Sequence, residues 1–417
     1  MNTDLIKQDN NFYSYQTNDF SSIFIKHIFN IEYTPRNYCL AKILCSYMMR
    51  SNEVYKTEKE IQDKSKMLYR TMFFAHTEIK GTKLFIYLSL KMIDQKVIDE
   101  DFFNDAIEFF KDMVNKPNFN KVKLDKSVVD EIKKDIINTV QRIEKNPDKY
   151  QSILFYRNML PESDFNYKNP SFDDLKEMLD NIKDKDIIDF YHTTIDRHIA
   201  TYTFGNLSDE QNKIIKDSFK FKTFTFDYFY EHKENLTDDY KVIKSNDTTQ
   251  SYLYIAYDIS DYKKENTYIY YALLPMFNPF KGLCHKILRD ELGIVYHTYA
   301  DFLSNRGIFI ICAQIDKKNT DKALAGIDEV MKRILDKDFL EEILTFTKEK
   351  YTQELDTSTE LLNSNLVYIE RYILKSEMLK NDLVDKINTL TVDDIIKQIN
   401  NLKKKYIFLY EGDKDEN

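Results

Sequence analysis

The chain has few of the residues that interrupt regular structure. Its 417 residues include only 7 Gly and 7 Pro, the two residue types that most often break helices and strands. Hydrophobic residues make up 42% and charged residues 31% of the sequence, which are ordinary values for globular proteins. We therefore expect a globular protein rich in helices and strands, and its length predicts two or more domains.

Paired cysteines, long apolar runs and an excess of positive charge are also missing. The four cysteines lie inside apolar stretches without C-x-x-C spacing: Cys39, Cys45, Cys284 and Cys312. The first residues lack the pattern of a secretory signal, and charged residues interrupt every hydrophobic segment before it reaches the roughly 20 residues of a membrane helix. With 60 basic and 69 acidic residues interspersed, the sequence predicts a cytoplasmic protein that binds neither nucleic acid nor membrane.

No common catalytic motif is present in the sequence. It contains no G-x-S-x-G nucleophile elbow, no P-loop and no G-x-G-x-x-G turn. The seven histidines form neither H-E-x-x-H nor its inverse. We expect His192 and His198 to lie at the surface or an interface, and Cys284, beside His285, to be a small core residue. A self-sufficient enzyme of unrelated mechanism would have to work without any of these motifs.

The two halves of the chain show the same order of expected elements. Each half has a strand, helical segments, two further strands, long helices and a closing strand with a glycine turn. A capping-box spacing, in which an acceptor precedes an acid by three residues, occurs late in each half, at Ser171–Asp174 and Thr391–Asp394. We infer an internal duplication. The expected strands are 21–33, 69–78, 82–91 and 200–205, then 251–258, 294–303, 307–316 and 405–412.

The repeated order predicts an α+β fold of two similar domains, each an antiparallel-rich sheet packed with helices on one side. The first domain is expected at residues 1–225 and the second at residues 249–417. Apolar residues become sparse between them, so residues 226–248 are predicted to be a linker.

A short motif in the second half points to a family. The segment from Arg289 through Gly293 to Tyr296 reads R-D-E-L-G-I-V-Y, and a strand, Ser304–Gly307 and another strand follow it. Locally, Gly293 fits the residue after a helix end and Arg289 a last-turn cation. The segment resembles the R-E-x-x-G-L-x-Y motif of the carboxyl-terminal domain of the pitrilysin, insulysin and mitochondrial-processing-peptidase family, and the duplicated element order extends the resemblance over nearly the whole chain.

This resemblance implies a two-halved clamshell whose first domain binds zinc in active members. Their helix after the first strand carries H-x-x-E-H, which supplies two zinc ligands and the general base. Here the expected helix 35–50 contains no His, Glu or Asp, and the alignment places Ile43, Ser46 and Tyr47 at the three motif positions. Asp125 or Glu131 aligns with the family's third ligand, but a lone carboxylate does not make a zinc site. We expect no metal or cofactor in this chain.

The resemblance also implies a division of labour between two subunits. The chain would be the catalytically inactive subunit of a heterodimeric zinc peptidase, with no activity alone. A homologous partner carrying H-x-x-E-H would hold the zinc, while Arg289 and Tyr296 would contact an extended or unfolded peptide. Processing of a precursor or leader peptide is one expected role. A structural scaffold that handles no peptide is the alternative. Family members often have a glycine-rich loop before the Arg helix, whereas Met276–Gly282 has a single glycine.

Overall fold

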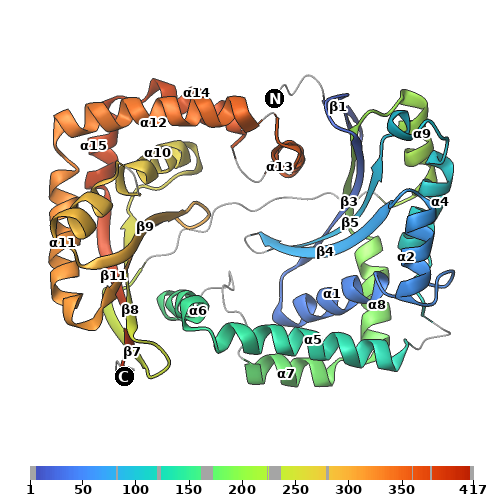
Figure 1. The fold of residues 1–417 in the computed structure, drawn as a ribbon, viewed down its shortest axis with the longest axis horizontal. Coiled ribbons are helices and arrows are strands. Elements are labelled where there is room, and N and C mark those ends of the chain that lie inside the picture. The colour runs from blue at the N-terminus through green and yellow to red at the C-terminus, as the bar shows by residue number, and fades with distance from the viewer. Residues whose placement is uncertain are drawn as a thin grey trace. The chain divides into compact units, whose positions relative to one another are not determined.

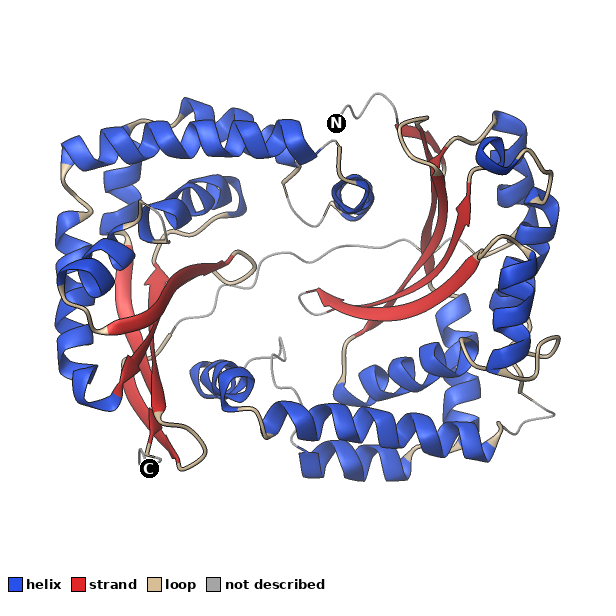
Figure 2. Cartoon of the chain, viewed as in Figure 1, coloured by secondary structure: helices blue, strands red, loops and turns tan. Residues whose placement is uncertain are grey.

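The computed structural model describes residues 6–80, 83–119, 124–160, 172–222, 224, 236–278, 281–358, 360–375 and 378–413. The chain forms two compact units, one of residues 1–142 and 169–228 and the other of residues 143–168 and 229–417. Each unit contains one β-sheet with helices packed on it (Figures 1 and 2). This confirms the predicted α+β class. No helix in the described ranges combines the length and apolar character needed to cross a membrane.

The first unit is built on a six-stranded sheet with the order β1-β2-β6-β3-β5-β4. β2 and β6 are parallel, and the other neighbours are antiparallel. The strands are β1 (Ile6–Asp9), β2 (Phe12–Gln16), β3 (Ser22–Glu32), β4 (Met72–Lys80), β5 (Lys83–Ile93) and β6 (His198–Gly205). The helices are α1 (Pro35–Met48), α2 (Glu58–Met67), α3 (Gln95–Ile98), α4 (Phe103–Asn115), α5 (Lys126–Glu144), α7 (Phe172–Asn181), α8 (Asp184–Ile195) and α9 (Asp209–Ser218).

The second unit is built on a five-stranded sheet with the order β7-β11-β8-β10-β9. Its strands are β7 (Asp239–Ser245), β8 (Gln250–Ile259), β9 (Val295–Leu303), β10 (Ile308–Asp316) and β11 (Leu402–Gly412). A π-helix (His285–Glu291) precedes β9, and short 3₁₀ turns lie at Lys264–Asn266 and Lys317–Asn319. The α-helices are α6 (Pro147–Met159), α10 (Thr267–Phe277), α11 (Thr320–Arg333), α12 (Lys337–Ser358), α13 (Leu362–Leu374), α14 (Lys380–Thr389) and α15 (Val392–Asn400).

The two sheets repeat one topology, which confirms the predicted duplication. From β2 and from β7 onward, the strands of each repeat lie in the order first, fifth, second, fourth, third, and the first and last strands are parallel. A glycine ends each closing strand where it meets the start of its neighbour. A Cβ atom on Gly205 would lie 2.9 Å from the Ser22 carbonyl oxygen, and one on Gly412 would lie 2.5 Å from the Gln250 carbonyl oxygen. Thr391 caps α15 as predicted, whereas Ser171 lies outside the described residues.

The contacts of two elements differ from the expected division at residues 225 and 249. β7 lies within residues 226–248 and pairs in parallel with β11. It lies on a sheet edge, and most of its residues, including Tyr240 and Val242, are exposed. α6 comes from the first half of the sequence but packs in the second unit, where Phe155 stacks on Tyr254 with ring centroids 4.3 Å apart. α6 thus covers the face of the second sheet opposite the one packed against α10 and α11.

A buried hydrogen-bond chain crosses β3 and β6. The side-chain nitrogen Nδ2 of Asn11 lies 3.0 Å from Nδ1 of His198, and Nε2 of His198 lies 2.9 Å from the Thr201 hydroxyl. That hydroxyl lies 2.7 Å from Nδ1 of His27. If Asn11 donates, the His198 proton sits on Nε2, which donates to Thr201, and Thr201 donates to His27. In this hydrogen-bond arrangement both imidazoles are neutral. The expectation of a surface or interface position for His198 is wrong, because its ring is buried and completes the network.

This network predicts acid sensitivity of the first unit. Burial lowers the pKa of His198 to about 4 and that of His27 well below its usual value, to which the nearby His198 also contributes. Below about pH 6.5 the unfolded chain therefore binds more protons than the folded chain does. The free energy of unfolding should fall by up to about 1.4 kcal/mol per pH unit for each histidine as the pH drops from about 6.5 toward the folded pKa.

Urea unfolding followed by far-UV circular dichroism at several pH values measures this slope, since the chain has no Trp for fluorescence. His198→Gln should show a shallower loss of stability with falling pH than the wild type. His192→Gln is the control, because His192 is exposed on α8. Equal slopes for wild type and His198→Gln would contradict the prediction.

Candidate functional site

The structure brings Arg289 and Tyr296 together at the start of β9. Arg289 lies in the last turn of the π-helix, and Gly293 follows it with a φ of 64° that a residue with a Cβ rarely adopts. The Ile294 amide donates to the Leu288 carbonyl at 3.0 Å and closes the helix end. Nη1 of Arg289 then reaches the Tyr296 carbonyl oxygen at 3.2 Å. The predicted helix-end role of Gly293 is confirmed. The helix itself is a π-helix, a type that is rare in proteins and, where it occurs, often lies at a functional site.

Tyr296 occupies a bulge in an edge strand. Val295 pairs with Ile315 and His297 pairs with Gln314, so Tyr296 is the extra residue between them. Bulges near sheet edges redirect a side chain, and the Tyr296 side chain is 51% exposed. Its hydroxyl donates to Oδ1 of Asp316 at 2.9 Å. Both ends of this tyrosine are thereby held, the carbonyl by Arg289 and the hydroxyl by the last residue of β10.

The π-helix is fixed against α11 by packing and by an ion pair. A Cβ atom on Gly326 would lie 2.5 Å from a terminal methyl group of the buried Leu288, so a glycine permits this close approach. Nη1 of Arg333 lies 2.9 Å from both carboxylate oxygens of Glu291. Glu291 follows Arg289 by two residues, so these contacts determine where the Arg289 backbone lies.

The outer edge of β9 is closed by side chains of the same unit. The Asn278 side chain donates to the Ala300 carbonyl at 3.1 Å and accepts from the Ala300 amide. Oδ1 of Asp301 accepts from the Phe302 amide at 2.8 Å. An open edge strand offers such backbone groups to another strand. Because these groups, like the Tyr296 carbonyl, already have partners, β9 is a poor place to add a peptide strand.

The glycine-poor segment before the π-helix uses its one glycine for a tight turn. The Gly282 amide donates to the Asn278 carbonyl at 3.1 Å, and a Cβ atom on Gly282 would lie 2.1 Å from that oxygen. The segment thereby places Asn278 beside β9. Pro279 and Phe280 lie outside the described residues.

The three residues that the sequence alignment places at the zinc-motif positions lie on α1 and belong largely to the core. Ile43 and Tyr47 are fully buried, and Ser46 is half-buried. The Tyr47 hydroxyl donates to the Asn118 carbonyl at 2.8 Å and accepts from the Asp125 amide at 3.1 Å. Burial raises the pKa of this hydroxyl, so it stays protonated and can keep both bonds. The side chain at the second histidine position therefore fastens α1 to the segment before α5.

The other candidate metal ligands have structural partners. Oδ1 of Asp125 accepts from the Ser127 amide and hydroxyl at the start of α5, which lowers the pKa of Asp125. Glu131 lies 3.5 Å from Arg50. Cys284 is fully buried, as predicted. Across the described part of the chain, no group of three or more His, Cys, Asp and Glu residues is arranged to hold a metal ion.

Two residues of the site carry no sequence pattern. Asp316 comes 20 residues after Tyr296, and Asn278 comes 22 residues before Ala300. Only the pairing of β9 with β10 and the turn at Gly282 bring them to the site. A bulge also leaves no mark in the alternation of residues over such a short strand.

The chain is similar in sequence and fold to several known proteins. The family model for the peptidase M16 inactive domain matches residues 181–351. A probable inactive metalloprotease, YmfF, from Bacillus subtilis is 22% identical over 79% of each chain. A conserved Enterococcus faecalis protein of known structure has a TM-score of 0.83 at 17% identity and 97% coverage of both chains. The periplasmic protease PqqL from Escherichia coli has a TM-score of 0.72 at 13% identity, covering 99% of this chain and 47% of that one.

Removing the Tyr47 hydroxyl should weaken the first unit. Tyr47→Phe leaves the Asn118 carbonyl and the Asp125 amide without their partner, and we expect a loss of about 1–3 kcal/mol in the free energy of unfolding. Urea unfolding measures the change. Tyr38→Phe, on the same helix but only partly buried, is the control and should change stability by less than about 0.5 kcal/mol. Equal effects of the two substitutions would show that Tyr47 is not a fastening residue.

Proposed function

We propose that this chain, a peptidase-M16-like protein with an M16 inactive domain at residues 181–351, is the non-catalytic subunit of a heterodimeric zinc peptidase. Its partner is a homologous subunit that carries H-x-x-E-H and supplies the zinc and the general base. This chain contributes Arg289 and Tyr296 as contacts for an extended peptide. A precursor or leader peptide is the substrate class, and a cytoplasmic location stays a prediction.

The observation that carries the proposal is the contrast between α1 and the start of β9. At α1, Ile43 and Tyr47, which the sequence alignment places at the metal-ligand positions, are buried. At β9, Arg289 and Tyr296 are exposed; Arg289 donates to the Tyr296 carbonyl, and the Tyr296 hydroxyl donates to Asp316. A chain whose described residues form no metal-binding group but which keeps this exposed donor pair is suited to bind a peptide that another subunit cleaves.

The chemistry of the pair fits a peptide backbone. Arg289 uses one of its five N–H donors on Tyr296 and has others for a carbonyl or carboxylate. The Tyr296 hydroxyl donates its proton to Asp316, and a hydroxyl oxygen can also accept from a peptide N–H. Because the β9 edge is closed at Ala300 and Phe302, the peptide meets side chains here. The partner subunit must then supply any strand pairing.

The length of one similar protein supports the need for a second subunit. This chain matches 47% of the PqqL chain, so that protease has slightly more sequence outside the matched part than within it. A heterodimer would assemble a comparable amount of chain from two polypeptides. The fold likeness does not carry the substrates of that protease to this one.

A scaffold role is the second candidate, and the closed edge of β9 favours it. Asn278, Asp301 and Arg289 all occupy outward backbone groups of this strand, which also protects an isolated sheet edge from association. The two candidates differ in one respect: a scaffold needs Arg289 only for its own fold, whereas a peptide-binding subunit needs it for cleavage by the complex.

Substitution at the site should reduce cleavage by the complex without preventing its assembly. In a complex with the zinc-bearing partner, Arg289→Ala should lower kcat/KM for a peptide by about 10- to 100-fold, because a charged hydrogen bond to the peptide is lost. Tyr296→Phe should lower kcat/KM by about tenfold. Lys286→Ala, an exposed substitution on the same π-helix, is the control. Zinc-dependent cleavage that Arg289→Ala leaves intact would favour the scaffold.

A further inference from the structure

A cavity in the second unit lies outside the pair formed by Arg289 and Tyr296. Its volume is about 630 Å³, and it is bounded by the 3₁₀ turn at Lys264–Asn266, the last turn of α13 and the start of α14. Ligand pockets of a few hundred Å³ accept small molecules or a few peptide residues. Nothing in the proposed contact of the peptide with β9 uses this space.

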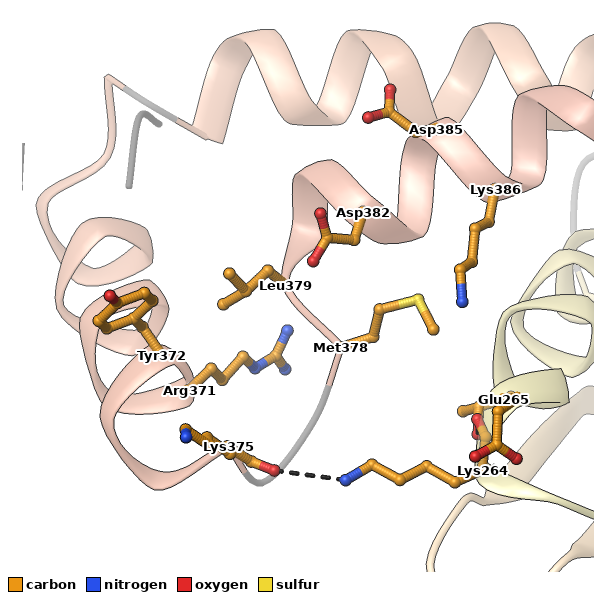
Figure 3. A pocket seen from close by; sticks show the side chains of 11 residues that line it. Lys264, Glu265, Arg371, Tyr372, Lys375, Met378, Leu379, Asp382, Asp385 and Lys386 are labelled. Atoms are coloured by element: carbon orange, nitrogen blue, oxygen red, sulfur yellow. Dashed lines mark hydrogen bonds between the residues drawn. The ribbon is translucent and has the colours of Figure 1, made fainter. Parts of the chain in front are cut away.

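Positive and negative side chains line the cavity together with the apolar side chains of Met378 and Leu379. Figure 3 shows the Arg371 guanidinium extending from α13 toward Met378 and Leu379, with the Asp382 carboxylate on the α14 side. The wall carries four basic and three acidic side chains in a protein with a net charge of -9. Met378 and Leu379 are half-buried and offer an apolar surface, which the flexible Met378 can adjust to a neighbouring group.

The geometry of the cavity wall is fixed by the backbone around Lys375. This residue ends α13 in the left-handed conformation, with a φ of 49°, and its carbonyl oxygen accepts from Nζ of Lys264 at 3.5 Å. The 3₁₀ turn and α13 are thus linked across the cavity. Such a conformation is uncommon for a residue with a side chain, and here it ends α13 one turn after Arg371.

The charges select a monovalent anion. A guanidinium binds a planar carboxylate through two parallel hydrogen bonds. Arg371 lines the cavity and is partly exposed, and it also interacts within the chain. Burial lowers the pKa of neighbouring Lys380, and the positive charge of Arg371 adds to that effect. Asp382 and Glu265 would repel a doubly charged phosphate more strongly than a carboxylate.

We propose that this cavity binds a carboxylate of a peptide at Arg371, while Met378 and Leu379 contact an adjacent apolar side chain. This inference rests on the proposed function, because it supplies a second contact for the same class of ligand. The carboxylate belongs either to a peptide C-terminus or to an internal acidic residue, and the experiment below separates these sources.

Peptide binding to the full chain tests the cavity. The probes are a fluorescein-labelled alanine-leucine decapeptide with a free C-terminus, the same peptide amidated, and the amidated peptide with one internal glutamate. Fluorescence anisotropy should show tighter binding of at least one carboxylate peptide than of the neutral amide. Preference for the first peptide assigns the C-terminus as the source, and preference for the third assigns an acidic side chain.

Two cavity substitutions should change this preference in opposite directions. Arg371→Gln should raise the Kd of the preferred peptide by about tenfold, whereas Asp382→Asn should lower it several-fold by removing a repulsive charge. Lys403→Gln removes an exposed positive charge from β11 of the same unit, outside the cavity, and should leave the Kd unchanged. Circular dichroism checks that each variant is folded.

The outcomes separate this inference from the proposed function. Equal binding of all three peptides, or an unchanged preference in both Arg371→Gln and Asp382→Asn, overturns the cavity assignment. If binding then still depends on Arg289, the proposed function stands without the cavity. If binding depends on Arg371 but not on Arg289 or Tyr296, the cavity assignment stands and the role of the β9 pair is wrong.

Discussion

The structure depends on the insertion of each closing strand between the first two strands of its repeat. β6 pairs in parallel with β2 and antiparallel with β3, and all eight of its residues are buried. β11 does the same between β7 and β8. These long-range pairings join the two ends of each repeat into one sheet. In this order β5 and β10 lie inside their sheets, and β4 and β9 lie at the edges. The exposed Tyr296 is therefore on an edge strand, β9.

An edge position creates both the opportunity and the difficulty at this site. Side chains on β9 can reach solvent, but its outward backbone groups need partners or they attract another strand. The chain solves this with three side chains, since Asn278, Asp301 and Arg289 each bond an outward group. Arg289 bonds the Tyr296 carbonyl with one donor, and its side chain is exposed at the start of β9.

The sequence predicted those parts of the fold that depend on local pattern. The strands around β3, β5 and β8, the helix α1 and the Thr391 cap follow from alternation, helical spacing and capping. The pair Arg289 and Tyr296 followed from a motif. The remainder depends on contacts between distant residues. β7 is short and largely exposed, and its pairing with β11 depends on residues more than 160 positions away. The sequence of α6 likewise does not indicate which sheet it packs on, because this depends on the contact of Phe155 with Tyr254. The π-helix, the bulge and Asp316 are likewise set by packing and register.

The two halves of the chain differ in what holds their key residues in place. Ile43 and Tyr47 are buried, and replacing Tyr47 by histidine would remove a hydroxyl that satisfies two backbone groups. A metal centre at α1 would therefore require repacking of α1 against the segment before α5, beyond the exchange of three side chains. Arg289 and Tyr296 make exposed contacts, which contribute little to folding. Their order comes from Gly293 at the helix end, from the packing of buried Leu288 on Gly326 and from the exposed Arg333–Glu291 pair. The Arg289 and Tyr296 side chains are thus positioned by neighbouring residues and exposed to solvent, an arrangement suited to binding.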